Sequence, residues 1–369
     1  VIRRVPARRL WRQIMHRGYE TAEPGVLFVD RINRLNNLAF REYLTTTNPC
    51  GEVPLPPYGA CNLGSLNLTR FVLDPFTARA RMDLDAIRRE AGQATRLLDN
   101  VIDCSRFPLP EQKRQARGSR RVGLGITGLA DALMMLGLHY DSELARSEAA
   151  TIMRTICHAA YVTSVLLARE KEPFPFFKRE PYLESGFVST LPVKIRDRIA
   201  RHGIRTSHLT ALAPAGTISL LAGNISSGIE PVFDFRTRRK ILNREGREEI
   251  FELEDYALQR WYEKHSTAGP LPDTFVRARN LTPLAHLKMQ AALQPYVDNA
   301  ISKTINVRED FAFEDFKNLY MDAWHLGLKG CTAFRPNPVT GQILSPGGDP
   351  ETSSGQPDVH CCTPGRQCG

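Results

Sequence analysis

Helical segments alternate with short apolar runs along most of the chain, and this alternation constrains the fold more than any other feature of the sequence. Apolar side chains recur at helical spacing in the longer segments, and the short runs between them have the length of buried strands. The predicted helices cover residues 7–18, 25–36, 83–106, 121–137, 142–171, 192–202, 253–264, 283–293 and 313–327. The predicted strands lie near residues 208–213, 231–235, 303–307 and 331–334. This pattern is typical of an α/β fold.

The composition excludes several classes of protein. Of the 369 residues, 42% are hydrophobic and 24% are charged, as in ordinary globular proteins. The least polar stretch, residues 209–229, is broken by polar residues, Gly and Pro, so we expect no membrane span. The net charge of +9 is mild, and the basic residues near 7–18 indicate a solvated helix face rather than a nucleic-acid arm or a transit peptide. Eight irregularly spaced cysteines in so long a chain favour a reducing cytoplasm.

The strongest chemical signal is the stretch Asn48–Glu52, with the sequence NPCGE. If this stretch is extended, alternate residues share one face, so Asn48, Cys50 and Glu52 point the same way. A thiol is then available as a nucleophile or hydrogen-atom donor, a carboxylate as a base, and an amide as a hydrogen-bonding group. The structural alternative is a turn with a buried cysteine, and spacing alone leaves both open.

A second thiol, Cys61, follows eleven residues after the first. The flanking Gly59 and Gly64 permit close backbone approach. Two neighbouring thiols suggest redox chemistry. A buried structural cysteine is an equally good interpretation of Cys61 from the residues alone.

A loop rich in Gly, Thr and Ser follows a predicted strand at residues 213–231. Such loops offer backbone N–H groups and hydroxyls to phosphate oxygens, although no Gly-Lys-Ser/Thr sequence marks a P-loop. The alternative is a hydrogen-bonded loop without a ligand. The candidate phosphate-binding residues are Pro214, Ala215, Gly216, Thr217, Ile218 and Ser219.

The segment Gly123–Gly128 matches G-x-G-x-x-G, the pattern of dinucleotide-binding sites. Such a site needs an apolar strand directly before the glycines, whereas residues 114–121 are mostly basic and polar. We therefore interpret residues 121–137 as one buried helix, in which the glycines permit close packing, and expect no dinucleotide site.

The chain from residue 346 to 369 is rich in Pro, Gly and Ser, and we expect a flexible tail. It carries Cys361, Cys362 and Cys368 without the paired spacing of a zinc site, so we expect no metal there. A mobile dithiol that exchanges with another disulfide and a tail without a role both remain open.

At these residues the sequence resembles the large catalytic chain of ribonucleotide reductases, most closely the adenosylcobalamin-dependent class. The run from Asn48 to Leu68, which begins NPCGEVPLPPYGACNLGS, is very specific to that family. The resemblance covers about residues 7–345. Its other matching stretches are residues 120–136, 213–233, 294–306 and 327–341.

The resemblance implies a ten-stranded α/β barrel, of which residues 1–345 form the C-terminal part, with a finger loop in its centre. It implies that Cys50 becomes the thiyl radical that abstracts the 3′ hydrogen of the ribose. Glu52 then takes the 3′-hydroxyl proton, and Asn48 binds the substrate hydroxyls. Cys61 is one of two cysteines that reduce the 2′ position, and the tail cysteines carry electrons to that disulfide. The Pro214–Ser219 loop binds the substrate phosphates, although Ala215 stands where the family usually has Thr.

The resemblance also implies the cofactor and the partners. Phe334 and Arg335 stand where the two-subunit, metal-radical class carries adjacent tyrosines, so adenosylcobalamin is the expected radical source. A ribonucleoside diphosphate is the expected substrate and thioredoxin or a similar dithiol the reductant, with dNTP or ATP effectors and a homodimer. We expect the partner of Cys61 and most effector and cobalamin contacts upstream of Val1, and hence a fragment that is inactive alone and prone to aggregate.

Three other functions compete with this interpretation. A two-subunit reductase requires a separate radical-generating subunit, and a catalytically inactive nucleotide-binding chain requires no second redox cysteine. A cysteine hydrolase requires a histidine beside the thiol. No histidine lies between His16 and His139, which disfavours the hydrolase.

Overall fold

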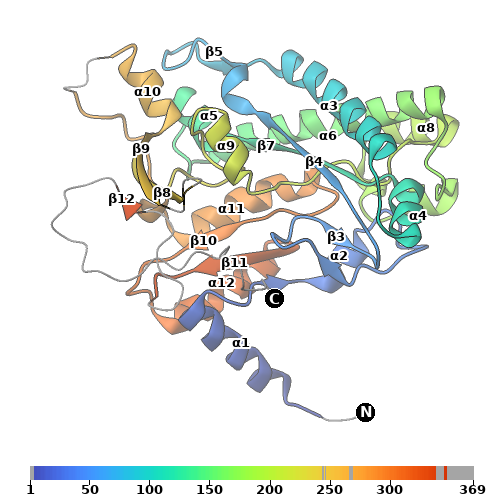
Figure 1. Cartoon of the computed structure of the whole chain (residues 1–369), viewed down its shortest axis with the longest axis horizontal. Coiled ribbons are helices and arrows are strands. Elements are labelled where there is room, and N and C mark those ends of the chain that lie inside the picture. The colour runs from blue at the N-terminus through green and yellow to red at the C-terminus, as the bar shows by residue number, and fades with distance from the viewer. Residues whose placement is uncertain (1–3, 243–244, 246, 266–268, 338–344, 347–369) are drawn as a thin grey trace.

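The computed structural model describes residues 4–242, 245, 247–265, 269–337 and 345–346 (Figure 1). The helices are α1 (Ala7–Thr21), α2 (Val29–Arg34), α3 (Leu84–Cys104), α4 (Pro110–Ser119), α5 (Leu129–Met135), α6 (Glu143–Lys171), α7 (Arg179–Leu183), α8 (Val193–His202), α9 (Gly216–Leu221), α10 (Tyr256–Tyr262), α11 (Pro283–Leu293) and α12 (Phe313–His325). The strands are β1 (Val26–Leu27), β2 (Thr46–Thr47), β3 (Pro54–Leu55), β4 (Asn62–Asn67), β5 (Val72–Leu73), β6 (Arg81–Met82), β7 (Val122–Thr127), β8 (Arg236–Leu242), β9 (Glu248–Glu254), β10 (Thr304–Asn306), β11 (Gly330–Phe334) and β12 (Ser345–Pro346). The predicted α/β class is confirmed.

A ladder of parallel strands runs through the molecule. It begins with β4 beside β7 in the register Asn62↔Val122. A parallel bridge joins Leu124 to Thr210, and a second joins Leu212 to Ile301. The ladder then continues from β10 to β11, and β1 closes that end in the antiparallel sense. Helices connect successive members, as parallel pairing requires.

The ladder is open at β4. Among the described residues no strand pairs with the outer edge of β4, and no closed barrel is formed. The prediction of part of a barrel is therefore supported only as far as a parallel α/β ladder. The number of strands in the whole assembly stays a prediction.

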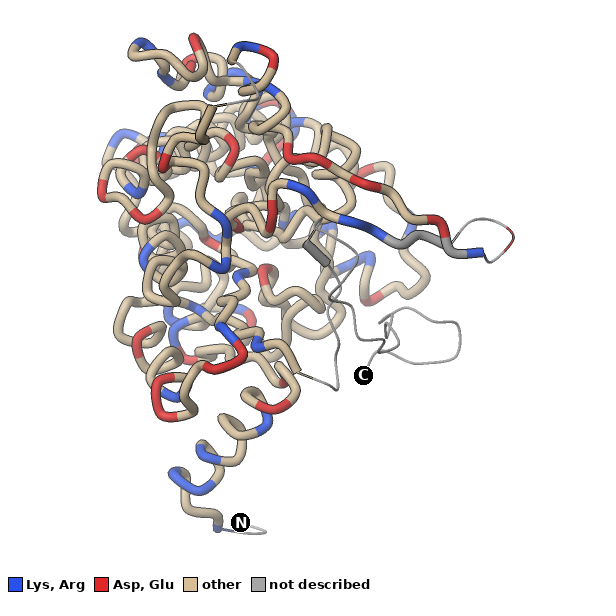
Figure 2. The backbone as a smooth tube through the Cα atoms, turned by 90° about the vertical axis from the view of Figure 1, so that its left-hand side faces the viewer, with Lys and Arg blue, Asp and Glu red and all other residues tan. Residues whose placement is uncertain are grey.

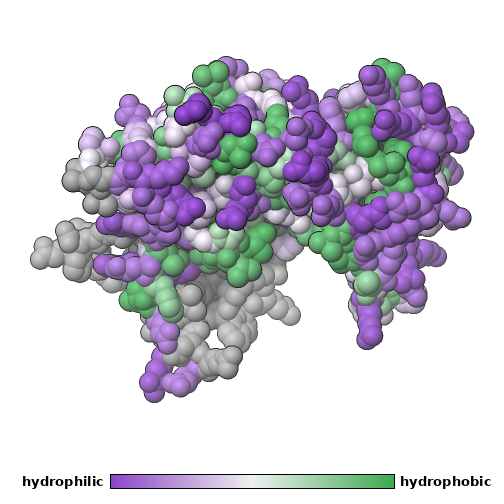
Figure 3. Space-filling model, turned by 90° about the horizontal axis from the view of Figure 1, so that it is seen from above, coloured by the Kyte–Doolittle hydropathy of each residue, from purple (hydrophilic) through white to green (hydrophobic). Residues whose placement is uncertain are grey.

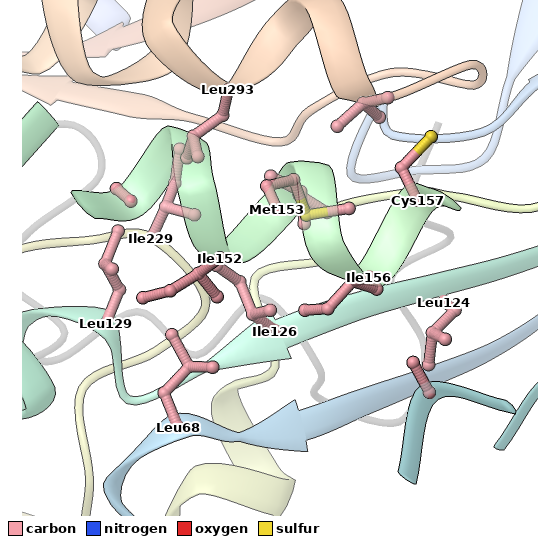
Figure 4. Close-up of a cluster of buried hydrophobic side chains, with 14 of the residues drawn as sticks. Leu68, Leu124, Ile126, Leu129, Ile152, Met153, Ile156, Cys157, Ile229 and Leu293 are labelled. Carbon is pink, nitrogen blue, oxygen red and sulfur yellow. The ribbon is translucent and has the colours of Figure 1, made fainter. Parts of the chain in front are cut away.

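The main core lies between the ladder and its covering helices. Figure 4 shows α6 lying over β7, with Leu293 of α11 approaching from the opposite side of α6. Ile152 and Ile156 of α6 are completely buried, and α3 packs on the same helix. Local sequence sets the start of both helices, since Asp83 caps α3 at the N–H of Ala86 and Ser142 caps α6 at the N–H of Ala145.

Helix α6 is long and apolar enough to cross a membrane by length and composition alone. However, 56% of its most apolar window is buried inside the molecule. Burial on this scale identifies a core helix. Figure 3 views the molecule from the side on which Figure 1 shows α10, β5 and α3, and hydrophilic residues there are interspersed with hydrophobic patches.

A β-hairpin formed by β8 and β9 extends from the body of the chain (Figure 2). Basic residues gather on β8 and acidic residues on β9. Arg236 pairs with Glu254 at 3.0 Å and Arg238 with Glu252 at 3.1 Å. These exposed cross-strand pairs contribute little stability individually, but they favour the observed register.

The prediction of one helix over residues 121–137 is wrong. Residues 122–127 form β7, a strand buried along its whole length, and only α5 is helical. The glycines bring strands together rather than helices. A Cβ on Gly125 would lie 2.3 Å from the carbonyl oxygen of Ala211, and one on Gly123 would lie 2.6 Å from a methyl group of Leu63.

Three other predicted elements differ from the structure. Residues 231–235 form no strand, and residues 208–213 form only isolated bridges at Thr210 and Leu212. The predicted helix over 25–36 is divided into β1 and the shorter α2. In short segments, periodicity alone does not distinguish helix, strand and buried loop. Residues 45–70 contain the short strands β2, β3 and β4, joined by loops.

We predict that Gly125→Ala destabilises the chain by roughly 1–3 kcal/mol, the usual cost of forcing one extra group into a packed core. Denaturant unfolding measures the change. Gly269→Ala is the matched control, because no atom of the described residues lies within 4 Å of a Cβ at that position. Equal stability of the two variants would show that β7 and residues 209–212 are not packed as described.

Candidate active site on the finger hairpin

Residues 46–55 form a short hairpin, here called the finger. Strand β2 pairs with β3 in the register Thr46↔Leu55, and residues 48–53 form the turn between them. The N–H of Gly51 donates to the carbonyl oxygen of Asn48 at 3.1 Å, and Gly51 has φ +83°. Of the two conformations left open for Asn48–Glu52, the structure shows the turn, because this backbone reverses direction at a glycine in the left-handed region.

The turn nevertheless brings two of the predicted side chains together. The Nδ2 of Asn48 donates to Oε1 of Glu52 at 2.8 Å, and the N–H of Val53 donates to Oδ1 of Asn48 at 2.9 Å. The amide is thus fixed at both ends and orients the carboxylate. Extended geometry was not required for this contact, since a turn also brings residues i and i+4 together.

One carboxylate oxygen of Glu52 has no partner. Glu52 is 2% exposed, and its Oε2 is buried without a hydrogen bond among the described residues. Buried polar atoms usually have partners, so an orphaned acceptor calls for an explanation. Oε2 of Glu52 is therefore available to accept a hydrogen bond or a proton from a ligand hydroxyl.

Cys50 lies at the tip of the turn and is exposed. Partial burial of the thiol, and then the nearby charge of Glu52, raise its pKa. Its thiolate is therefore scarce at neutral pH, which disfavours nucleophilic catalysis. The protonated form is the one required of a hydrogen-atom donor.

Cys61 lies immediately before β4. Burial raises the pKa of its thiol to about 12, with the charges of Asp298 and Glu52 acting in the same direction and Arg121 opposing. The thiol donates to the carbonyl oxygen of Asn62 at 3.5 Å. The influence of Glu52 places Cys61 in the electrostatic environment of the finger. All five cysteines of the described part are unpaired.

Buried polar residues that sequence reasoning missed anchor the finger to the ladder. Arg121 donates to the carbonyl oxygen of Pro54 at 2.8 Å and forms an ion pair with Glu42. The N–H of Ala300 donates to the carbonyl oxygen of Glu52 at 2.9 Å. Arg121 could have been suspected as a buried anchor, because it is a basic residue directly before a strand that is buried along its whole length. No sequence pattern marks Ala300, because it binds the finger only through its backbone N–H.

The Pro214–Ser219 loop leaves the ladder beside this anchor, since the N–H of Leu212 donates to the carbonyl oxygen of Ala300. Ala215 has φ +52°, and α9 begins at the next residue. Gly216, Thr217 and Ile218 are exposed. The hydroxyl of Ser219 is occupied within the loop by Ala215 and Ser227. Phosphate binding by this loop stays a prediction.

The remaining candidate residues do not extend the site. The predicted tail thiols Cys361, Cys362 and Cys368 lie outside the described residues. Within residues that the structure describes, no group of three or more His, Cys, Asp and Glu side chains is arranged to hold a metal ion.

We predict that Glu52→Gln accelerates alkylation of Cys50 by iodoacetamide at pH 8 in the full chain. Removing the negative charge lowers the thiol pKa, so the thiolate fraction rises by roughly two- to fivefold. Peptide mapping by mass spectrometry gives the rate, with exposed Cys104 as internal reference. An unchanged or slower rate at Cys50 would contradict the electrostatic coupling of the two residues.

Comparison with known proteins identifies the family. A model of the ribonucleotide reductase barrel domain matches residues 1–334. The vitamin B12-dependent ribonucleoside-diphosphate reductase of Mycobacterium tuberculosis (strain H37Rv) is 37% identical over 361 residues, covering 94% of this chain and 48% of that protein. The enzyme of the same name from Thermoplasma acidophilum is 35% identical over 363 residues, covering 94% and 45%. The ribonucleoside-diphosphate reductase large chain of Encephalitozoon cuniculi is 28% identical over 378 residues, covering 92% and 47%.

The chain spans about half the length of these curated relatives. The matched region includes the finger, the ladder and the loop after residue 212. The chain therefore belongs to the ribonucleotide reductase barrel-domain family.

Proposed function

We propose that the protein containing this chain reduces ribonucleoside diphosphates to 2′-deoxyribonucleoside diphosphates for DNA synthesis, by thiyl-radical chemistry on the finger. The observation that supports it best is that one turn carries both the exposed thiol of Cys50, whose pKa is raised, and a buried carboxylate oxygen of Glu52 without a partner among the described residues. The names of the relatives supply the substrate class.

The residues of the finger account for the first half of the reaction. The sulfur of Cys50, as a thiyl radical, takes the hydrogen atom from C3′ of the ribose. Glu52 accepts the proton of the 3′-hydroxyl at its unpartnered oxygen, which assists loss of the 2′-hydroxyl. Asn48 holds the carboxylate in position through its bond to the other oxygen.

The second half of the reaction consumes a dithiol. Cys61 and a second cysteine supply two electrons and two protons as they close a disulfide. The 2′-hydroxyl leaves as water, and C2′ gains a hydrogen. Cys50 returns the first hydrogen atom to C3′ and regains its radical. The high pKa of Cys61, about 12, keeps this thiol protonated until it reacts.

The radical comes from adenosylcobalamin in this proposal, and the residues present fit that source. When bound, adenosylcobalamin supplies the radical that removes the hydrogen atom from a thiol. Cys50 is the residue that would face it, because its side chain is exposed at the tip of the turn and its thiol is protonated. The names of the Mycobacterium and Thermoplasma relatives give the same dependence for those enzymes.

A two-subunit reductase is the second candidate. Its radical would enter through adjacent tyrosines near the end of β11. That end carries Ala333, Phe334 and Arg335. None of these side chains is a phenol, so the proposal favours the cofactor over a partner subunit.

The substrate diphosphate is assigned to the loop at the end of residues 209–212. The exposed backbone of Gly216, Thr217 and Ile218 supplies donors, with Pro214 and Ala215 shaping the turn and Ser219 bracing it from within. The hydrogen bond between Leu212 and Ala300 supports the assignment, because it connects this loop to the finger anchor.

Several wider features remain part of the proposal. Residues 1–345 would form the C-terminal part of a ten-stranded barrel, and residues 346–369 a tail that carries electrons from thioredoxin or a similar dithiol. The effectors would be dNTPs or ATP, bound outside this chain. The assembly would be a cytoplasmic homodimer without nucleic-acid or membrane partners.

We predict that the full-length protein reduces a ribonucleoside diphosphate anaerobically with a dithiol only when adenosylcobalamin is present. Cys50→Ala should abolish turnover, because no other side chain at the turn relays a hydrogen atom. The assay measures deoxyribonucleotide formation with and without the cofactor.

Cys104→Ala is the matched control, since Cys104 is also an exposed thiol but lies at the end of α3. It should retain the wild-type rate. Turnover that requires a second subunit and ignores the cofactor would establish the two-subunit class. Nucleotide binding without turnover under any condition would indicate an inactive binding chain.

A further inference from the structure

The finger turn, residues 48–53, is attached to the ladder behind it by a single backbone hydrogen bond. Among the hydrogen bonds of the described residues, only the N–H of Ala300 reaches this turn from outside the hairpin, at the carbonyl oxygen of Glu52. Arg121 binds just beyond the turn, at Pro54. The position of Ala300 therefore sets the position of Glu52.

Residues 297–300 are themselves held from one side by the neighbouring strand. The carboxylate of Asp298 accepts from the N–H groups of Leu209 and Thr210, each at 2.8 Å. The N–H of Asn299 donates to the carbonyl oxygen of Thr210 at 3.1 Å. The N–H of Leu212 also donates to the carbonyl oxygen of Ala300 at 3.1 Å. These bonds fix the segment toward residues 209–212 but leave the carbonyl groups of residues 297–299 available to another partner.

The other side is held by Lys329, which lies directly before β11. Its ammonium group donates to the carbonyl oxygen of Asp298 at 2.6 Å, to that of Val297 at 3.4 Å, and to that of Asn299. One side chain thus binds three consecutive peptide carbonyls. The next residue after this group, Ala300, is the one that anchors the finger.

This arrangement is costly. Lys329 is 2% exposed and forms no ion pair in the described part of the chain. Burial lowers the pKa of its ammonium to about 7, opposed by Asp298 and assisted by Arg121. An apolar side chain of similar size would avoid the cost of burying an incompletely compensated charge. The unfavourable burial of the Lys329 ammonium group therefore indicates a role for its hydrogen bonds to residues 297–299.

We propose that Lys329 is a positioning residue for the active site: by binding the carbonyl groups of residues 297–299, it fixes Ala300 and thereby the finger turn that carries Cys50 and Glu52. The structural part of this inference stands on the contacts alone, and its catalytic consequence rests on the proposed function. Lys329 touches no reacting atom, so it acts only through the backbone.

Hydrogen exchange tests the structural part without any assay of activity. In the full-length protein, Lys329→Met should make the amide of Ala300 exchange about tenfold faster or more, because its hydrogen bond is no longer held in place. The amide of Val53, inside the turn, should follow. Mass spectrometry of overlapping fragments resolves these amides.

Lys303→Met is the matched control. Lys303 is an equally buried lysine three residues beyond Ala300, but its ammonium binds Glu230 and the ring of His286 instead of the residues before the anchor. It should leave the protection of Ala300 and Val53 within about twofold of wild type, whatever it costs in global stability. Equal loss of protection in both lysine variants would overturn the proposal, because it would show a general effect of losing a buried charge.

Lys329→Gln is the second variant, and it retains a donor in a neutral side chain. Exchange at Ala300 that stays within about twofold of wild type in a folded Lys329→Met variant would also overturn the proposal, and so would a Gln variant that loses more protection than the Met variant although it keeps a donor. Should neither variant fold, the wild type decides. The Ala300 amide must then be protected as strongly as the Leu124 amide of β7, and a hundredfold faster exchange would contradict a fixed anchor.

Steady-state kinetics tests the catalytic consequence. Lys329→Met should lower kcat by roughly ten- to a hundredfold while KM changes little, since small misplacements of reacting groups cost that much. A rise in KM alone would assign Lys329 to substrate binding and overturn the positioning role. Loss of Ala300 protection in a protein that reduces no nucleotide would sink the proposed function but leave the structural role intact.

Discussion

The buried carboxylate of Asp298 is the interaction on which the arrangement of the site depends. It connects residues 209–212 to the segment that ends at Ala300, and it also accepts a hydrogen bond from the hydroxyl of Tyr161 at 2.7 Å. Burial raises its pKa, although these donors and Lys329 oppose the rise. A satisfied polar network of this kind is worth more for defining one geometry than for stability.

This network positions the finger turn. The proposed chemistry of the turn requires both a protonated thiol and a carboxylate with one oxygen available. In the proposed reaction a hydrogen-atom donor must stay protonated, and partial burial together with the charge of Glu52 raises the pKa of the Cys50 thiol. A base must keep one oxygen available, and Asn48 satisfies the other oxygen of Glu52. Glu52 thus favours the protonated thiol of Cys50, and Asn48 leaves one oxygen of Glu52 available. Such mutual adjustment of ionisable groups is typical of functional sites.

The sequence predicted those parts of the molecule whose causes are local. Apolar periodicity located α3 and α6 almost to the residue. The NPCGE motif singled out Asn48 and Glu52, which the structure brings into contact, while the catalytic roles of Asn48, Cys50 and Glu52 stay a prediction. The spacing of these residues could not decide between an extended stretch and the turn that forms where Gly51 reverses the chain. Strand β7 was missed because its glycines resemble packing positions of the apolar helix that follows.

The anchoring residues were missed for a different reason. Arg121 meets Asn299 across 178 residues of sequence, and Lys329 meets the carbonyl group of Asp298 across 31. Periodicity and short motifs indicate contacts only between residues that are close in sequence. A lysine buried by distant segments has the same local signature as a lysine on the surface.

The central claim is that the Cys50 thiol relays a hydrogen atom from C3′ of the ribose, and a substrate labelled at that carbon tests it most directly. Turnover of a 3′-deuterated ribonucleoside diphosphate by the full-length protein, in anaerobic competition with the unlabelled substrate, measures whether this bond breaks. The account predicts slower turnover of the deuterated substrate and no turnover of either with Cys50→Ala. Equal rates of the two substrates, together with turnover that survives loss of Cys50, would contradict it.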